Sequence, residues 1–199
     1  MANTVSRRDV LKSLALSGAS SSALRLIPLQ RAVRVHEMLQ RDKAAASAGG
    51  AYTPRFFTSH QYKTLQALCQ AIIPPDDRSA GAIEAGVPEF IDLLTSENKD
   101  YQLQLGGGLM WLDATCADLY GKNYLDCTAA EQKQILDLLA YRENVRKNSG
   151  LSQGIRFFAL LRDLTTDGFY TSEIGIKDLH YLGNTFVAEF PGCPPVPEG

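Results

Sequence analysis

The feature that most constrains this chain is a set of apolar stripes with helical spacing, found without any segment of strand spacing. In residues 59–73 apolar side chains recur at three- and four-residue steps, and three later segments repeat this pattern. Such steps place side chains on one face of an α-helix. No five consecutive residues alternate cleanly between apolar and polar types with β-branched enrichment. We therefore predict an all-α fold.

Capping and helix-breaking residues set the expected limits of these helices. Thr58 and Gln61 form a capping box ahead of the first stripe, and Pro74-Pro75 ends it. Thr128 and Glu131 form a second capping box. The predicted helices run over 59–73, from Pro88, over 101–120, after Thr128 and over 152–164. Their expected inward residues are Tyr62, Leu65, Leu68, Cys69, Ile72 and Ile73; Leu105, Leu109, Leu112, Cys116 and Leu119; Ile135, Leu138 and Leu139; and Ile155, Phe158, Leu161 and Leu164.

Both ends of the chain lack this periodicity. Ala44–Ala51 is a low-complexity Ala/Ser/Gly linker, so the folded domain is expected to begin near Tyr52. Residues 165–199 are rich in glycine, proline and aromatic residues and are expected to form a long irregular tail. The predicted organisation is a signal segment and linker over 1–51, followed by a compact multi-helix domain over 52–199.

Charge distinguishes the N-terminus from the rest of the chain. Residues 1–50 carry eight Lys and Arg against three Asp and Glu, a balance of +5. The other 149 residues carry twelve against nineteen, a balance of -7, and the two give the net charge of -2. A basic excess confined to one end is typical of a targeting segment and does not favour nucleic-acid binding.

The basic segment has the order of an export signal. Ser6-Arg7-Arg8-Asp9-Val10-Leu11-Lys12 precedes a weakly apolar stretch of small residues. It resembles the twin-arginine signal, with Val10 where phenylalanine is usual. We expect export through the twin-arginine translocase to the periplasm, with Arg7 and Arg8 as the signal residues. The alternative is a basic amphipathic helix of a cytosolic protein. The linker Ala44–Ala51 is a late junction for cleavage, and whether cleavage occurs stays open.

Motifs that suggest catalysis have simpler structural explanations. Gly106-Gly107-Gly108 lies inside a helical pattern and lacks the strand and Lys-Ser/Thr of a phosphate loop, which favours close helix packing or a local kink. Asp76-Asp77 follows two prolines in a turn, where aspartate caps its own backbone. His60 and His180 have no neighbouring residues at triad or metal-ligand spacing. We expect no catalytic, cofactor-binding or metal-binding residue in this chain.

The four cysteines differ in their surroundings. Cys69 and Cys116 lie on predicted core stripes, where cysteine serves as a small apolar residue. Cys116 and Cys127 are eleven residues apart across a helix-to-turn reversal, which makes them a candidate disulfide. Cys193 lies between Pro191-Gly192 and Pro194-Pro195, without apolar neighbours to bury its thiol. In an oxidising compartment we expect it to be bridged within the chain or to a partner.

Several short segments resemble one known family. They are Ala71–Pro74, Ala80–Ala82, Gly86–Ile91, Trp111–Asp113, Gly168–Ser172, Gly175–Leu179, Tyr181–Asn184 and Pro191–Pro194. In this order, over residues 55–195, they resemble the gluconate 2-dehydrogenase subunit 3 family. His180 departs from the pattern because a small residue such as glycine is expected there.

The resemblance implies a non-catalytic small subunit of a periplasmic sugar or gluconate dehydrogenase complex. The partner would be a large FAD-dependent subunit of the glucose-methanol-choline type, and a cytochrome subunit with haem c would take the electrons. The small subunit would supply the twin-arginine signal, act as a chaperone for the flavoprotein, and reach the membrane through the complex. The alternative is a stand-alone periplasmic enzyme or binding protein with an unrecognised site.

The tail is the predicted docking element. Aromatic residues dominate binding energy in many interfaces, and glycine permits close backbone approach. The alternative is that these aromatics close the core of the domain itself. The residues expected at the partner interface are Phe169, Tyr170, Tyr181, Asn184, Phe186, Phe190 and Cys193.

Overall fold

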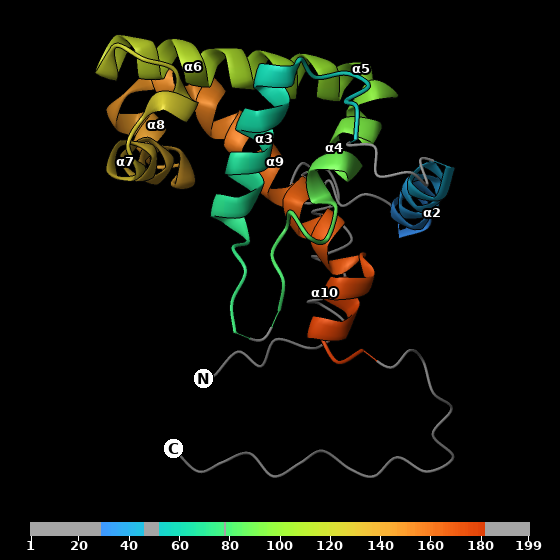
Figure 1. Cartoon of the computed structure of the whole chain (residues 1–199). Coiled ribbons are helices and arrows are strands. Elements are labelled where there is room, and N and C mark those ends of the chain that lie inside the picture. The colour runs from blue at the N-terminus through green and yellow to red at the C-terminus, as the bar shows by residue number, and fades with distance from the viewer. Residues whose placement is uncertain (1–28, 46–51, 78, 182–199) are drawn as a thin grey trace, which may run out of the picture.

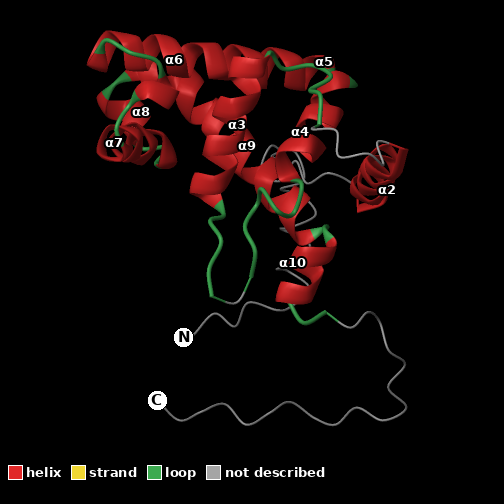
Figure 2. Ribbon diagram, in the orientation of Figure 1, coloured by secondary structure: helices red, strands yellow, loops and turns green. Residues whose placement is uncertain are grey.

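The prediction of an all-α fold is confirmed. The structure is a computed structural model that describes residues 29–45, 52–77 and 79–181. Every regular element in these ranges is a helix (Figure 2). The elements are α2 (Leu29–Ala45), α3 (Ser59–Ile72), α4 (Val87–Ser96), α5 (Lys99–Tyr101), the π-helix η2 (Gln102–Gly106), α6 (Gly107–Tyr120), the 3-10 helix η3 (Tyr124–Asp126), α7 (Ala129–Ala140), α8 (Asn144–Lys147), the 3-10 helix η4 (Ser149–Leu151), α9 (Ser152–Tyr170) and α10 (Glu173–Asp178).

The long helix α9 is the centre of the arrangement. It contacts α3, α4, α6, α7 and α10. In Figure 1, α6 runs along the top of the body, α2 lies beside α4 at one side, and α10 lies at the lower end. The buried apolar residues of all these helices belong to one core cluster.

Both predicted capping boxes are present. The Thr58 side chain accepts a hydrogen bond from the Gln61 backbone N–H, while the Gln61 side chain accepts one from the Thr58 N–H. Thr128 and Glu131 make the same reciprocal pair at the start of α7. These bonds satisfy backbone donors that have no partner within the helix.

Most predicted core residues are buried, with two corrections. Leu138 was expected to face inward but is 38% exposed, because the buried stripe of α7 is centred on Ile135 and Leu139 and Leu138 lies to one side of it. Leu119 is 55% exposed. It lies in the last turn of α6, next to the reversal at Gly121, where φ is 72°.

The expected irregular tail from residue 165 is also wrong in part. Helix α9 continues to Tyr170, and α10 follows after a two-residue turn. Thr165 and Gly168 have low helix propensity, but packing outweighs this preference. Thr165 is buried and its hydroxyl donates to the Leu161 carbonyl at 2.8 Å, while Gly168 lies against Phe90 of α4.

Helix α2 extends the packed body upstream of Tyr52, the expected start of the domain. Ala32, Val35 and Leu39 are buried in the core cluster, and α2 packs on α4. The His36 ring stacks on Phe90 with 4.9 Å between ring centroids. Its Nε2 lies 3.0 Å from the Thr171 hydroxyl, so α2 is joined to α4 and to the end of α9.

Two glycines bring α6 and α9 into close contact. A Cβ atom at Gly108 of α6 would overlap the Phe157 ring of α9. A Cβ at Gly154 of α9 would likewise overlap the Trp111 ring of α6. In each helix, therefore, a glycine packs against an aromatic ring of the other helix. The structural explanation of Gly106–Gly108 as a packing motif therefore holds at Gly108.

A buried carboxylate attaches the segment before α3 to α4. Asp92 is fully buried, and its Oδ1 accepts hydrogen bonds from the backbone N–H groups of Phe56 and Phe57, both at 3.1 Å. Its Oδ2 accepts from the Arg55 N–H and from the Tyr52 hydroxyl, both at 2.7 Å. Burial, followed by this hydrogen bond, raises the pKa of Tyr52. Four donors compensate the cost of burying this carboxylate.

The glycine contact predicts opposite effects for neighbouring substitutions. Gly108→Ala should lower the free energy of unfolding by about 1–3 kcal/mol, because the new methyl group displaces the Phe157 ring. Gly107→Ala is the matched control, since the nearest atom to its Cβ is Nε2 of Gln153 at 3.9 Å. It should raise the free energy by about 0.5–1 kcal/mol through helix propensity. Urea unfolding of the three proteins checks this, and equal effects at the two positions would contradict it.

Candidate functional site

Exposed apolar side chains occur at and beside α10, at the end of the described chain. Tyr170 is 40% exposed, Ile176 37%, Leu179 57% and Tyr181 56%. We call these four residues the C-terminal apolar surface. Exposed apolar groups that lie together mark contact sites for other molecules more often than isolated ones do.

The predicted docking residues fall into three groups. Phe169 is only 2% exposed and packs in the core, so for this residue the alternative, closure of the domain's own core, holds. Tyr170 and Tyr181 are exposed. The remaining residues, Asn184, Phe186, Phe190 and Cys193, lie outside the described residues, as do Arg7 and Arg8 of the export signal.

The turn that follows α10 explains the unusual residue His180. Its φ of 51° lies in the left-handed region, where glycine meets no steric cost. The His180 N–H donates to the Lys177 carbonyl at 3.0 Å, and the Tyr181 N–H donates to the Ile176 carbonyl at 3.2 Å. This is the Schellman arrangement that ends many helices. The turn fixes the backbone between two members of the C-terminal apolar surface, Ile176 and Tyr181.

A hollow of about 740 Å³ lies between α10 and the loop after α3. The loop contributes Asp76, Ser79 and Ala80, and Lys177 and His180 line the other side. The Ser79 N–H donates to Asp76 Oδ1 at 2.8 Å, so Asp76 caps the turn as its sequence context predicts. The hollow has both polar and apolar lining residues and borders α10, which carries Ile176 and is followed by Leu179.

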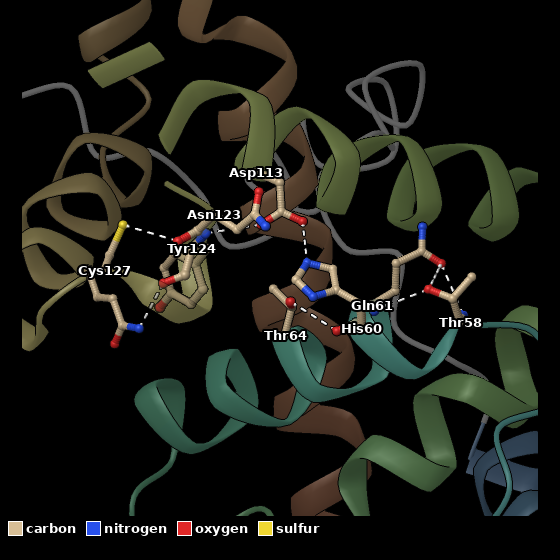
Figure 3. A network of polar contacts seen from close by, with 9 residues as sticks. Thr58, His60, Gln61, Thr64, Asp113, Asn123, Tyr124 and Cys127 are labelled. Carbon is tan, nitrogen blue, oxygen red and sulfur yellow. Dashed lines mark hydrogen bonds and ion pairs between the residues drawn. The ribbon is translucent and has the colours of Figure 1, made fainter. Parts of the chain in front are cut away.

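A polar network joins α3, α6 and the turn into α7 (Figure 3). His60 Nε2 lies 2.7 Å from Asp113 Oδ2, and Asp113 Oδ1 accepts from the Tyr124 N–H at 3.0 Å. The Gln132 side chain donates to the Tyr124 carbonyl at 2.9 Å. We call this region the α6–α7 junction. The sequence did not indicate the His60–Asp113 contact, because its partners are 53 residues apart.

The junction fits a structural role better than a catalytic one. The Thr64 hydroxyl, one turn after His60 in α3, donates to the His60 backbone carbonyl at 3.1 Å, which engages it within the helix. The Asp113 carboxylate is shared between a side chain of α3 and a backbone N–H of η3. Three elements are thereby held together at one carboxylate.

The junction also contains the candidate disulfide pair. Cys116 and Cys127 are both buried free thiols, as is Cys69. The Cys127 thiol donates to the Asn123 carbonyl at 3.4 Å (Figure 3). Burial, followed by the neighbouring Cys127, raises the pKa of Cys116 to about 12. Cys69 instead lies 3.7 Å from the Thr165 hydroxyl, and burial raises its pKa to about 12. A disulfide between Cys116 and Cys127 stays a prediction.

No group of three or more His, Cys, Asp or Glu side chains within the described residues is placed to hold a metal ion. None of the helices described is both long and apolar enough to cross a bilayer.

Fold and surface together define a small all-helical protein with apolar side chains exposed at its C-terminal end. The family model for gluconate 2-dehydrogenase subunit 3 matches residues 59–192. Because this match covers more than half of the chain, the chain belongs to the gluconate 2-dehydrogenase subunit 3 family. The family description makes it a subunit of a multi-subunit gluconate dehydrogenase complex. Comparison with curated proteins gave no match, and neither did comparison with solved structures.

The turn at His180 predicts a stabilising substitution. His180→Gly should raise the free energy of unfolding by about 1 kcal/mol, because glycine adopts the left-handed conformation without steric cost. Lys177→Gly, three residues earlier in α10, should lower it, since glycine weakens the interior of a helix. Thermal unfolding distinguishes the two. Destabilisation by His180→Gly would show that the histidine side chain itself holds the turn.

Proposed function

We propose that this chain is the non-catalytic small subunit of a periplasmic, FAD-dependent dehydrogenase of sugars or gluconate. In this proposal it binds and stabilises a flavoprotein of the glucose-methanol-choline type and carries it through the twin-arginine pathway. The FAD belongs to that partner, and haem c belongs to a cytochrome subunit that receives the electrons. Membership of the subunit 3 family supports a role within a dehydrogenase complex.

The observation that carries the docking role is the C-terminal apolar surface. Leu179 and Tyr181 are more than half exposed although both lie beside a well-packed core. A left-handed turn fixed by two backbone hydrogen bonds holds the chain between Ile176 and Tyr181. An ordered apolar surface loses little conformational entropy on binding, which favours its use as an interface.

The export role is supported by the N-terminal sequence. Arg7-Arg8 lies in a twin-arginine pattern, and the packed helix α2, described over Leu29–Ala45, follows it in the sequence. The signal is thus joined to a helix that is part of the folded body. The translocase carries folded proteins, so a tightly bound partner would travel with the chain.

The docking role predicts a local loss of affinity. Replacing Ile176 and Leu179 together with aspartate should weaken binding of the flavoprotein tenfold or more, or by at least about 1.4 kcal/mol. Leu103→Asp is the matched control, because Leu103 is 78% exposed but lies in η2, beside α5 and α6 and away from α10 (Figure 1). Titration of the purified flavoprotein with each variant measures the effect. Equal affinities of both variants and the unchanged chain would exclude α10 from the interface.

The carrier role predicts the location of the partner. Replacing Arg7 and Arg8 with lysine should leave both this chain and the dehydrogenase activity in the cytoplasm, since the translocase recognises the arginine pair. Cell fractionation with an activity assay measures this, and the same replacement of Arg31 and Arg34 in α2 with lysine is the control for loss of arginines outside the signal. Arrival of the flavoprotein in the periplasm without the arginine pair would refute the carrier role.

A further inference from the structure

The α6–α7 junction contains a dithiol that the family assignment does not explain. We propose that Cys116 and Cys127 form a modification site, which closes to an intramolecular disulfide by exchange with a disulfide reagent or a disulfide-bearing oxidoreductase. The site is built from residues of the described chain alone. It requires no partner subunit and therefore does not depend on the proposed function.

The backbone around the two cysteines brings them together. Cys116 lies in the penultimate turn of α6, and Cys127 directly follows η3. The chain reverses between them at Gly121, whose φ of 72° is in the left-handed region. The bond from the Tyr124 N–H to Asp113 holds η3 against α6 at 3.0 Å. The approach of the two cysteines is therefore fixed by the fold.

The two thiols are neighbours in the reduced form. Cys127 is near enough to Cys116 to raise its pKa, after the larger effect of burial, and the Cys127 thiol donates to the Asn123 carbonyl at 3.4 Å. Both residues belong to the core cluster, with exposed fractions of 0% for Cys116 and 7% for Cys127. Because the fold already brings the two residues together, closing a bond between their sulfur atoms requires only a local adjustment.

The greater exposure of Cys127 than of Cys116 assigns the order of the two exchange steps, with Cys127 reacting first. The Cys127 thiol loses its proton, and its sulfur attacks one sulfur of the reagent disulfide, so that one reagent thiolate leaves. The Cys116 thiol then loses its proton, and its sulfur attacks the Cys127 sulfur, which releases the second reagent thiolate. Both released thiolates take up the two protons. Two electrons pass from the cysteine pair to the reagent, which is reduced to two thiols.

The surroundings of the pair predict slow closure that speeds up with pH. Burial, followed by the neighbouring Cys127, raises the pKa of Cys116 above that of a free thiol. Little Cys116 thiolate is therefore present near neutral pH, which slows the second step, the attack of Cys116 on the mixed disulfide at Cys127. The rate of that step should continue to rise with pH to values where an ordinary thiol would have levelled off.

Cys69 provides a matched internal control. It is also fully buried, but the hydrogen bond of its sulfur is to the Thr165 hydroxyl. If burial in this core were sufficient for oxidation, Cys69 would react as well. If a neighbouring cysteine is required, oxidation stays confined to the pair.

The test uses the full chain with Cys193→Ser, which leaves three cysteines. After incubation of the folded protein with oxidised glutathione, the thiol count measured in denaturant should fall from three to one. Peptide mapping should then show residues 116 and 127 linked. The Tm of the oxidised protein should exceed that of the reduced protein by about 5 °C, because the crosslink closes a loop of the unfolded chain. Adding Cys69→Ser should leave both the link and the Tm shift intact.

Variants of the pair separate a specific link from general oxidation. Cys116→Ser and Cys127→Ser should each abolish both the link and the Tm shift, and Cys116→Ala and Cys127→Ala replace them if the buried hydroxyl impairs folding. Recovery of both residues as free thiols, or oxidation of Cys69 in their place, would overturn the proposal. Loss of flavoprotein binding would not affect it, because the readouts concern this chain alone.

Discussion

The arrangement of this protein depends on how closely other helices approach α9. Side chains normally keep helix axes 8–10 Å apart, and glycine permits a shorter separation. Gly154 of α9 lies against Trp111, and Gly108 of α6 lies against Phe157, so the contact is reciprocal. Farther along α9, Gly168 lies against Phe90 of α4. These contacts position α6 and α4 along one central helix, α9. Helix α10 follows at the C-terminal end of α9.

Two carboxylates, the buried Asp92 and the partly exposed Asp113, add directional constraints to this apolar framework. Asp92 gathers four donors from the segment before α3, and Asp113 links α3 to the turn before α7. Both aspartates lie on helices, and both bind backbone N–H groups outside their own helix. Apolar packing alone is tolerant of small shifts, whereas such bonds require defined distances and directions. These bonds hold the segment before α3 and the turn before α7 against the helices.

The sequence predicted those features of the helices that depend on residues close together in the chain. Helix starts at Thr58 and Thr128 follow from capping chemistry, and the stripes of α3 and α6 follow from helical spacing. It could not predict contacts between residues that are distant in the sequence, such as those of His60 with Asp113 and of Gly168 with Phe90. The contact of Gly168 with Phe90 also explains why α9 continues through residues of low helix propensity. The structure assigned Phe169 to the core because burial depends on what α9 packs against. The family motifs, and no single helix, indicated that the chain is a subunit of a gluconate dehydrogenase complex.

The packing of α2 has a consequence for maturation. Ala32, Val35 and Leu39 are buried where α2 packs on α4, with His36 stacked on Phe90 beside them. A peptidase that cuts upstream of Leu29 leaves this surface closed. A cut between α2 and Tyr52 has one of two results: α2 remains as a second, non-covalently held polypeptide, or an apolar face of α4 is opened to solvent. The site of any proteolytic processing thus decides between three forms of the mature subunit. It is a single chain, a body of two polypeptides held together without a covalent bond, or a body with a second exposed apolar surface.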